Sequence, residues 1–398
     1  MIHTRHLNNL KIVFGKLIFQ KESYEIFEKN IIDFISVISE EIFRNKFSRK
    51  YSDLIFFAFW CRKSNLIKIS KKYINNDLIL GRGTVFHIPP SNVPINFAYS
   101  LIFGLLSGNN NIVRIPSKNF IQVNILLKII LKILNIKKFI HLKKRICLIK
   151  YERSSEISSK ISKFVSARLI WGGDNTINEF KKYETQTRCV DLLFPNRYSI
   201  AVININKMKK LNRQKISQLA NNFFNDSYTM DQQGCSSPHA VFWVGGQKNQ
   251  ATKIFWKQLG ILINKKYQDD ISVANKKLSI IMNDILKFKT NYNLKYKKFN
   301  LTILNSSRLG RDLEKIQCGY GNFFEAKIKN LNNLKNIISN KYQTMLFYGF
   351  EKDELKKFLL KNKLNGIDRI VPIGRAFDMG PIWDGYDIIR SLSRVIAE

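Results

Sequence analysis

The chain has 398 residues, of which 45% are apolar and 12% aromatic, so its length and composition fit a packed protein of two or three domains. They exclude a small disulfide scaffold and a disordered polar chain. Lysine and arginine number 66 against 30 acidic residues, and the formal charge of +36 first suggests nucleic-acid binding. The basic residues are scattered from Lys11 to Arg394, however, which is typical of compositional drift. We therefore expect small anionic ligands and no specific nucleic acid.

Cysteine usage and hydropathy indicate the cellular setting. The five cysteines form no CxxC pair and the histidines no HExxH motif, so neither a disulfide framework nor a zinc site is expected. The N-terminus shows no secretory cleavage site, and apolar windows such as 95–106 are shorter than the roughly 20 residues of a membrane span. We expect a cytoplasmic protein without a metal or a membrane span.

The predicted elements change in character near residue 80. Apolar residues recur at helical spacing in the first 80 residues, which are expected to be helical. Beyond them we predict strands at 84–88, 111–115, 145–150 and 168–171, and helices at 93–106, 120–134 and 154–165. The alternation predicts an α/β fold with a doubly wound parallel sheet, because each crossover places its helix on a face of the sheet.

A second α/β region is predicted from Tyr198 onward. It includes strands at 240–244 and 344–348. The stretch from Lys265 to Lys298 is rich in lysine and asparagine and is expected to be the least ordered part of the chain.

Cys235 is the cysteine best placed for chemistry. It lies in the segment DQQGCSSP, where glycine and small polar residues indicate an accessible turn before a strand, whereas Cys61 lies within the apolar segment FFAFWC. Access is the first requirement for a nucleophile, although a purely structural turn is the alternative. His239 follows across a proline and is expected to point away from Cys235.

Asn92 occupies the junction between the predicted strand at 84–88 and the helix that follows. Its side-chain amide has two donors that can face a developing oxyanion. Simple capping of the helix is the alternative.

Four segments resemble one known family, in the same order along the chain. They read GRGTVFHIPPSNVPINFAYSLIFGLLSGNNNIVRIPSKN, LIWGGDNTI, DQQGCSSPHAVFWV and RIVPIGRAFDMGPIWDGYDIIRSLSR. From about residue 50 the chain is similar to the LuxC-type acyl-CoA reductases, the long-chain fatty acid reductases of the aldehyde dehydrogenase superfamily. The resemblance implies an aldehyde-dehydrogenase-like fold, with Cys235 as nucleophile and with Asn92 and the backbone N–H of Cys235 as oxyanion donors.

The resemblance also implies a domain organisation. We expect N-terminal helices and an NADP-binding domain over residues 1–197, and a catalytic domain carrying the cysteine over residues 198–365. Residues 366–398 are expected to form a C-terminal segment that packs back at the domain interface.

The cofactor is expected to be NADPH. Where the superfamily usually has a lysine and then an acid that holds the ribose hydroxyls, this chain has Arg114 and Ser117, which can bind a 2′-phosphate. The alternative for Arg114 is a surface cap. Gly172 and Gly173 match the glycine turn beneath the cofactor, and Glu325 the acid that contacts the nicotinamide ribose, although no GxGxxG motif is present.

The expected reaction is reduction of an acyl thioester. The Glu-Leu-Gly-Gly segment that activates water in oxidative relatives is absent, and residues 188–194 read RCVDLLF, with Asp191 as a possible stand-in base. The acyl donor would be acyl-CoA or an acylated partner enzyme, as in the luminescence system, and we expect a homo-oligomer. The alternatives are an NAD(P)-dependent aldehyde dehydrogenase that releases a carboxylic acid, and a non-catalytic basic nucleic-acid-binding protein.

Overall fold

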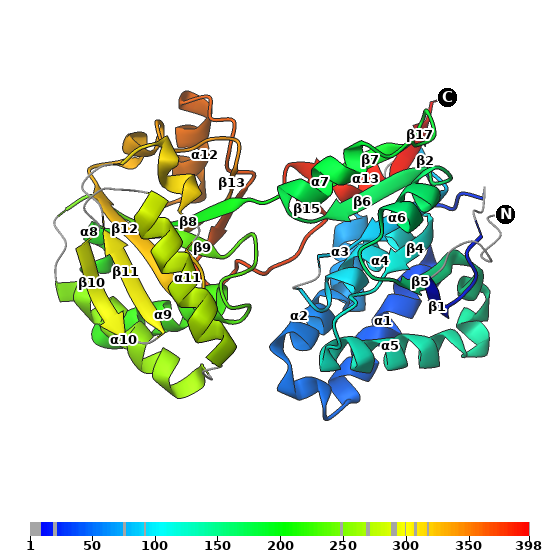
Figure 1. Ribbon diagram of the computed structural model, residues 1–398, viewed down its shortest axis with the longest axis horizontal. Helices are drawn as coiled ribbons and strands as arrows, with labels where there is room; N and C mark the ends of the chain where they lie inside the picture. The colour runs from blue at the N-terminus through cyan, green and yellow to red at the C-terminus, as the bar shows by residue number, and fades with distance from the viewer. Residues whose placement is uncertain are drawn as a thin grey trace. The chain divides into compact units, whose positions relative to one another are not determined.

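The computed structural model describes residues 9–18, 22–74, 77–90, 93–246, 250–267, 271–287, 293–298, 300–305, 309–316 and 318–397. The chain divides into two compact units, Met1–Asn196 with Met379–Glu398, and Arg197–Asp378 (Figure 1). The segment 366–398, expected to act as one part, is shared between them. Its first strand belongs to the second unit and its last strand to the first. The packing of this segment at a domain interface stays a prediction.

The first unit is built around a sheet with the strand order β1-β5-β4-β3-β6-β7. Strands β3 and β6 are parallel, and every residue of both is buried. Burial along the whole strand is typical of parallel strands that helices cover on both faces. The elements of this unit are β1 (Lys11–Phe14), α1 (Lys29–Arg44), η2 (Ser48–Lys50), α2 (Ser52–Trp60), α3 (Lys63–Ser70), β2 (Leu78–Gly81), β3 (Thr84–Ile88), α4 (Asn96–Leu106), β4 (Asn110–Arg114), α5 (Ile121–Leu134), η3 (Lys137–Arg145), β5 (Ile146–Lys150), α6 (Ser155–Ser162), β6 (Ala167–Trp171), α7 (Asp174–Lys181), β7 (Val190–Phe194), β15 (Ile382–Trp383), β16 (Tyr386–Asp387), α13 (Ile388–Ser391) and β17 (Ser393–Ile396).

The strand order of this sheet reverses between β3 and β6. On one face, α6 and α7 contribute Ile161 and Phe180 to a core cluster with Phe86 of β3. Helix α1 packs against α4 and α5, which follow β3 and β4 in the chain. This arrangement confirms the predicted α/β fold with a doubly wound sheet, and its switch point lies between the carboxyl ends of β3 and β6.

Two short strands interrupt the region that was expected to be helical. Strand β1 pairs with β5 as an antiparallel edge, and β2 pairs with β17 from the other end of the chain. Each has only four residues and a partner distant in sequence, so the local pattern of apolar residues gives no sign of either.

The second unit contains a sheet with the strand order β10-β11-β12-β9-β8-β13-β14, in which β10 is antiparallel to β11 and the other pairs are parallel. Its elements are β8 (Tyr198–Asn204), α8 (Ile205–Met208), α9 (Arg213–Tyr228), β9 (Pro238–Val244), α10 (Gln250–Lys266), α11 (Ile271–Lys287), β10 (Asn293–Lys298), β11 (Leu301–Asn305), η4 (Arg311–Lys315), β12 (Asn322–Ile328), η5 (Leu331–Leu334), β13 (Tyr342–Tyr348), α12 (Lys352–Lys361) and β14 (Arg369–Pro372). Part of the stretch from Lys265 to Lys298, at 268–270 and 288–292, lies outside the described residues.

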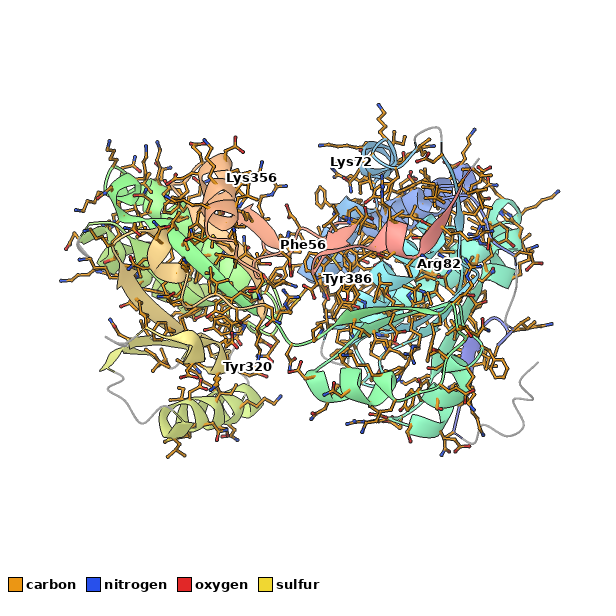
Figure 2. All side chains as sticks on the ribbon, turned by 90° about the horizontal axis from the view of Figure 1, so that it is seen from above. Phe56, Lys72, Arg82, Tyr320, Lys356 and Tyr386 are labelled. Atoms are coloured by element: carbon orange, nitrogen blue, oxygen red, sulfur yellow. The ribbon has the colours of Figure 1, made fainter. Side chains whose placement is uncertain are left out.

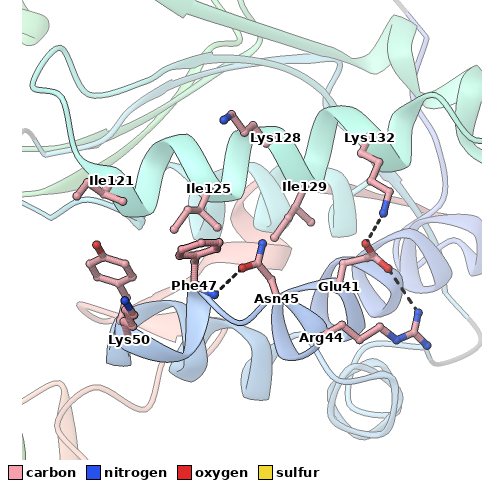
Figure 3. A pocket seen from close by; sticks show the side chains of 11 residues that line it. Glu41, Arg44, Asn45, Phe47, Lys50, Ile121, Ile125, Lys128, Ile129 and Lys132 are labelled. Carbon is pink, nitrogen blue, oxygen red and sulfur yellow. Dashed lines mark hydrogen bonds and ion pairs between the residues drawn. The ribbon is translucent and has the colours of Figure 1, made fainter.

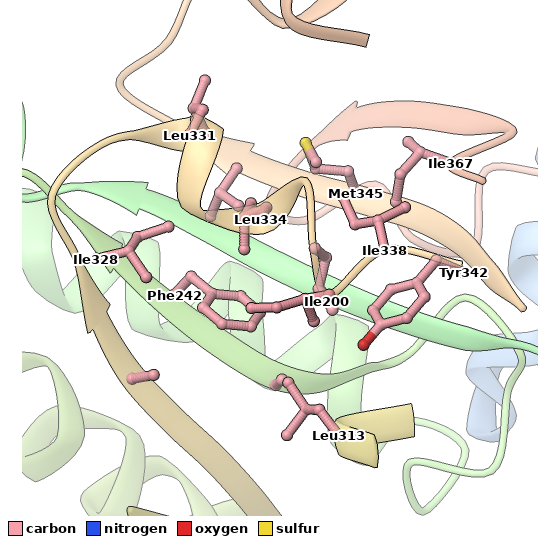
Figure 4. Close-up of a cluster of buried hydrophobic side chains, with 14 of the residues drawn as sticks. Ile200, Phe242, Leu313, Ile328, Leu331, Leu334, Ile338, Tyr342, Met345 and Ile367 are labelled. Carbon is pink, nitrogen blue, oxygen red and sulfur yellow. The ribbon is translucent and has the colours of Figure 1, made fainter. Parts of the chain in front are cut away.

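Successive residues of the buried strands serve two separate cores, as strand geometry requires. Phe242 of β9 joins Ile200, Leu334 and Met345 on the face covered by η5 and α12 (Figure 4). The next residue, Trp243, is fully buried on the opposite face, with α9 and α10. The sheet is therefore packed on both faces, which fixes the positions of residues at the ends of its central strands.

Basic side chains are exposed on both units, for example Lys72 after α3 and Lys356 on α12 (Figure 2). Several are paired, as Lys132 is with Glu41 and Lys138 with Asp33. Within the described part of the chain, every helix is too short or too polar to cross a bilayer.

Candidate active site

Cys235 lies in the turn before β9, and its side chain is half-buried. Its carbonyl accepts a hydrogen bond from Ser199 Oγ at 2.6 Å, and Ser199 Oγ accepts one from the Thr344 N–H at 3.1 Å. Gln343 Nε2 donates to Cys235 Sγ at 3.2 Å. The cysteine therefore lies at the amino ends of β8, β9 and β13, which are neighbours in the sheet.

The conformation of this turn is fixed by Gln232, whose backbone is in the left-handed region with φ of 60°. The buried Gln232 amide donates to the carbonyls of Pro238 and Asn322, both at 2.9 Å, and its Oε1 accepts the Gly321 N–H at 3.0 Å. A left-handed conformation is costly for a residue with a side chain, so these three bonds stabilise the turn that presents Cys235.

Arg369, at the start of β14, lies opposite Thr344 of β13 in register. Its half-buried guanidinium holds the loop that follows β14. It donates to the carbonyls of Arg375, Ala376 and Asp378 at 3.1, 2.5 and 2.6 Å. One side chain thus satisfies three backbone acceptors of a loop that has little regular structure.

The same loop packs against the cysteine turn. A Cβ on Gly234 would lie 2.7 Å from Phe377 Cε1, so the ring covers the residue immediately before Cys235. Asp226 of α9 accepts the N–H groups of Gly374 and Ala376 at 2.5 and 2.9 Å. Burial nevertheless raises the pKa of Asp226 to about 7, with these hydrogen bonds acting in the opposite direction.

The other four cysteines are poor nucleophiles. Burial raises the pKa of the Cys189 thiol to about 11 and that of Cys147 to about 12. It raises the pKa of Cys61 and of Cys318 well above the usual value. Because the thiolate is the reactive form, these thiols stay protonated and inert near neutral pH.

The carboxyl ends of the first sheet carry the predicted cofactor residues. The Arg114 guanidinium lies over the Tyr151 ring, 4.5 Å from its centroid, and donates to the Tyr151 carbonyl at 3.2 Å. Ser117 is half-buried in the bend after β4. Asn92 follows β3 and lies outside the described residues.

Gly172 and Gly173 connect β6 to α7, at the switch point of the sheet. A Cβ on Gly172 would lie 3.0 Å from Thr176 Cβ, a tight contact. A Cβ on Gly173, at the N-terminus of α7, would meet nothing closer than Asn196 Nδ2 at 3.5 Å, an ordinary contact distance, so this position could accept a methyl group without a clash.

The sequence model of the family "Acyl-CoA reductase (LuxC)" matches residues 68–395. The chain belongs to the LuxC acyl-CoA reductase family. This match confirms the resemblance seen in the motifs, and it places the protein among oxidoreductases of acyl groups.

Solved structures similar to this LuxC-family protein are members of the aldehyde dehydrogenase superfamily. They include an NAD-dependent aldehyde dehydrogenase from Sinorhizobium meliloti, at 10% identity and a TM-score of 0.64, over 92% of this chain and 81% of that one. The 1-pyrroline-5-carboxylate dehydrogenase of Thermus thermophilus is 9% identical, with a TM-score of 0.63 over 97% and 92% of the two chains. Proline utilization A from Bdellovibrio bacteriovorus is 13% identical with a TM-score of 0.61, and this chain spans 43% of its length. No curated protein matches the chain. The likenesses confirm the aldehyde-dehydrogenase-like fold.

Glu325 lies in the middle of β12, opposite Val241 of β9, and is 4% exposed. Its Oε2 accepts the indole N–H groups of Trp243 at 2.8 Å and Trp256 at 3.0 Å. The structure therefore places this carboxylate in the aromatic core between the sheet and α10. Its contact with the nicotinamide ribose stays a prediction.

Asp191 of β7 forms a bidentate ion pair with Arg168 of β6, at 2.7 and 2.5 Å. The same guanidinium donates to the Phe180 carbonyl at 3.0 Å, at the end of α7. The carboxylate thus ties two strands and a helix of the LuxC-family fold together, which is a structural role.

A groove of about 690 Å³ lies between α1 and α5 of the first unit (Figure 3). Its lining includes the apolar residues Phe47, Ile125 and Ile129 and the lysines Lys128 and Lys132. None of the predicted site residues lines it.

Sequence reasoning missed the residues that surround Cys235. Gln343 precedes a predicted strand without any local motif, and Asp226 lies inside a helix of ordinary amphipathic pattern. Arg369 lies in the last of the four family segments. That segment was the one sequence feature that could have pointed to it, but a rigid connection between the domains explained the segment as well as substrate contact did.

Proposed function

We propose that this protein reduces an acyl thioester to an aldehyde with NADPH, through an acyl group carried on Cys235. The observation that supports it is the environment of Cys235, a half-buried cysteine in a hydrogen-bonded turn with an amide donor 3.2 Å from its sulfur. Membership of the acyl-CoA reductase family gives the reaction type.

The first half-reaction is transfer of the acyl group to the protein. The Cys235 thiolate attacks the thioester carbonyl carbon, and a new C–S bond forms. The C–S bond to the carrier breaks, and the carrier leaves as a thiolate that takes a proton from water. We propose acyl-CoA, or an acyl group delivered by a partner enzyme, as the donor, and a homo-oligomer in the cytoplasm as the working form.

The second half-reaction releases the aldehyde. NADPH, when held at the first sheet, would supply a hydride to the acyl carbon carried on Cys235. The C–S bond to Cys235 then breaks, so the aldehyde leaves and the thiolate is restored. The backbone N–H of Cys235 and the Asn92 amide are the proposed donors to the oxyanion at both additions, each contributing about 3 kcal/mol in comparable sites.

NADPH is proposed to bind at the carboxyl ends of β3 and β6, because ligands of open α/β sheets bind at the switch point. The absence of a side chain at Gly173 and the N-terminus of α7 suit a close approach by the pyrophosphate. Arg114 and Ser117, after β4, are the proposed contacts to the 2′-phosphate.

The alternative of an aldehyde dehydrogenase releasing an acid requires a base that activates water. Asp191 was the one candidate for that base, and it is engaged by Arg168 through two hydrogen bonds. This pairing favours reduction over hydrolysis of the acyl group.

The proposal is tested by mass spectrometry of the protein after incubation with acyl-CoA thioesters of several chain lengths, without cofactor. One acyl group should appear on the peptide that contains Cys235, and NADPH added later should remove it as aldehyde. Cys235→Ala should form no adduct, whereas Cys189→Ala, the control, should form it like the wild type. An adduct of equal yield on Cys235→Ala would refute the mechanism.

A further inference from the structure

We propose that Gln343 and Arg369 hold Cys235 as the thiolate before any substrate or cofactor binds, with Gln343 donating to the sulfur and Arg369 acting as a positioning cation. The inference rests on the proposed role of Cys235 and adds two residues to it.

The geometry of Gln343 is the first support. Its side chain is 1% exposed, so its amide has little access to water. Nε2 donates to Cys235 Sγ at 3.2 Å, while Oε1 accepts from Thr344 Oγ1 at 3.0 Å. In this orientation of the amide, the Thr344 hydroxyl donates to Oε1 and the Nε2 donor faces the sulfur. A hydrogen bond to a charged acceptor is roughly twice as strong as one to a neutral acceptor, so this donor favours the thiolate over the thiol.

Arg369 supplies the positive charge. It lies at the start of β14, beside the strand that carries Gln343, and three carbonyls of the following loop fix its guanidinium. Burial lowers the pKa of Arg369, whereas charge interactions with Asp378, Cys235 and Asp226 act in the opposite direction. An arginine remains charged in this setting, and in a half-buried position its charge is screened less than at the surface.

Other charged groups near this pair are engaged with each other or with the backbone. Arg197, just before β8, pairs with Asp368, just before β14. Asp378 and Arg375 form an ion pair at 2.5 Å on the loop, and Asp226 accepts two backbone N–H groups from that loop. On the cysteine turn, Asp231 accepts the Tyr267 hydroxyl at 2.6 Å. His239, at the start of β9, stacks on Tyr198 with ring centroids 5.1 Å apart. Among these groups, Arg369 is the proposed cation, because its strand β14 pairs with β13, which carries Gln343.

A preformed thiolate explains how one of five cysteines becomes reactive in a chain where burial keeps the others protonated. Gln343, Arg369 and Cys235 all lie within the second unit, since β8, β9, β13 and β14 are neighbours in one sheet. Their arrangement therefore does not depend on Asn92 or on the cofactor.

The test is the pH dependence of Cys235 alkylation by iodoacetamide, an uncharged reagent, in the full chain without acyl donor or NADPH. The wild type should react with a midpoint below about 8, under the value of about 8.5 for a free cysteine. Gln343→Leu should move the midpoint up by about one pH unit, and Arg369→Met by about one to two. Arg369→Lys, which keeps the charge, should recover most of that shift.

Controls separate charge from folding. Gln258→Leu on α10 and Arg213→Met on α9 make the same chemical changes on other elements and should leave the midpoint unchanged. Thermal melting identifies any variant that fails to fold, and Gln343→Leu, which removes no charge, tests the donor if Arg369→Met is unstable. A midpoint at or above 8.5 in the wild type, or one within about 0.3 units of wild type in both folded variants, would overturn the inference. Because alkylation requires no acyl transfer, a low midpoint in a protein without reductase activity would refute the proposed function and leave this inference intact.

Discussion

The side-chain amide of Gln343 donates a hydrogen bond to the sulfur of Cys235 at 3.2 Å. The two residues belong to β13 and to the turn before β9, and β8 lies between those strands in the sheet. Ser199 of β8 completes the arrangement by binding the Cys235 carbonyl. The nucleophile is thus built at the amino ends of three strands of the second sheet, whereas the proposed cofactor site lies at the carboxyl ends of the first.

Gly173→Ala should leave the fold intact and weaken cofactor binding. The backbone at Gly173, with φ of −66°, suits alanine, and the added Cβ would have its nearest neighbour at 3.5 Å. We expect the KM for NADPH to rise at least about tenfold, because the methyl group takes the space proposed for the pyrophosphate. Thermal melting should match the wild type. An unchanged KM would show that the cofactor does not approach this turn.

Arg114→Ala should change the choice of cofactor. If its guanidinium binds the 2′-phosphate, kcat/KM with NADPH should fall about tenfold to a hundredfold, and kcat/KM with NADH should change by less than about threefold. Arg153→Ala is the control, since Arg153 is exposed and pairs with Glu179 at 2.7 Å. Equal losses with both cofactors would contradict the 2′-phosphate assignment.

Asp191→Asn should affect stability and spare the chemistry. The substitution breaks a bidentate ion pair with Arg168, which is 2% exposed, and leaves that cation without its partner. We expect the free energy of unfolding to fall by about 3 kcal/mol, measured by urea denaturation. The rate of aldehyde formation under conditions where the variant is folded should stay within about threefold of wild type. A large loss of rate with normal stability would instead make Asp191 a catalytic base.

His87 should make stability depend on pH. The ring is fully buried, with Nδ1 2.8 Å from Ser100 Oγ and Nε2 2.9 Å from Asn111 Oδ1, and burial disfavours its charged form. Burial lowers the pKa of His87 to about 4. Since the unfolded chain binds this proton near pH 6.5, stability is full above 6.5 and is lost by up to about 3 kcal/mol as the pH falls toward 4.

The His87 contribution is isolated by the variant His87→Gln. The difference in unfolding free energy between wild type and variant should shrink between pH 6.5 and 4, while contributions of other groups, such as Asp226, cancel. A difference that stays constant over this range would show that His87 is protonated in the folded state.

The sequence predicts the frame of the fold better than the surroundings of the cysteine. Strand β3 is found at 84–88 as predicted, because a short run of mostly β-branched and aromatic residues between turn residues favours a strand. Strands β1 and β2 are missed because each is short and pairs with a distant partner. Cys235 is recognisable from its turn and its motif, but Gln343 reaches it only through the pairing of β13 with β8, and Arg369 lies beside β13 only through the pairing with β14. Contacts of that kind depend on register, which no local pattern specifies.

The central claim is that Cys235 carries the acyl group during reduction. The most direct measurement is the rate of NADPH oxidation, with the aldehyde identified as product, for wild type, Cys235→Ala and the control Cys189→Ala, with saturating acyl-CoA. The account predicts that Cys189→Ala keeps the wild-type rate and that Cys235→Ala loses roughly a thousandfold or more, as expected when a nucleophile is removed. Aldehyde formation by folded Cys235→Ala at a rate within about threefold of wild type would contradict it.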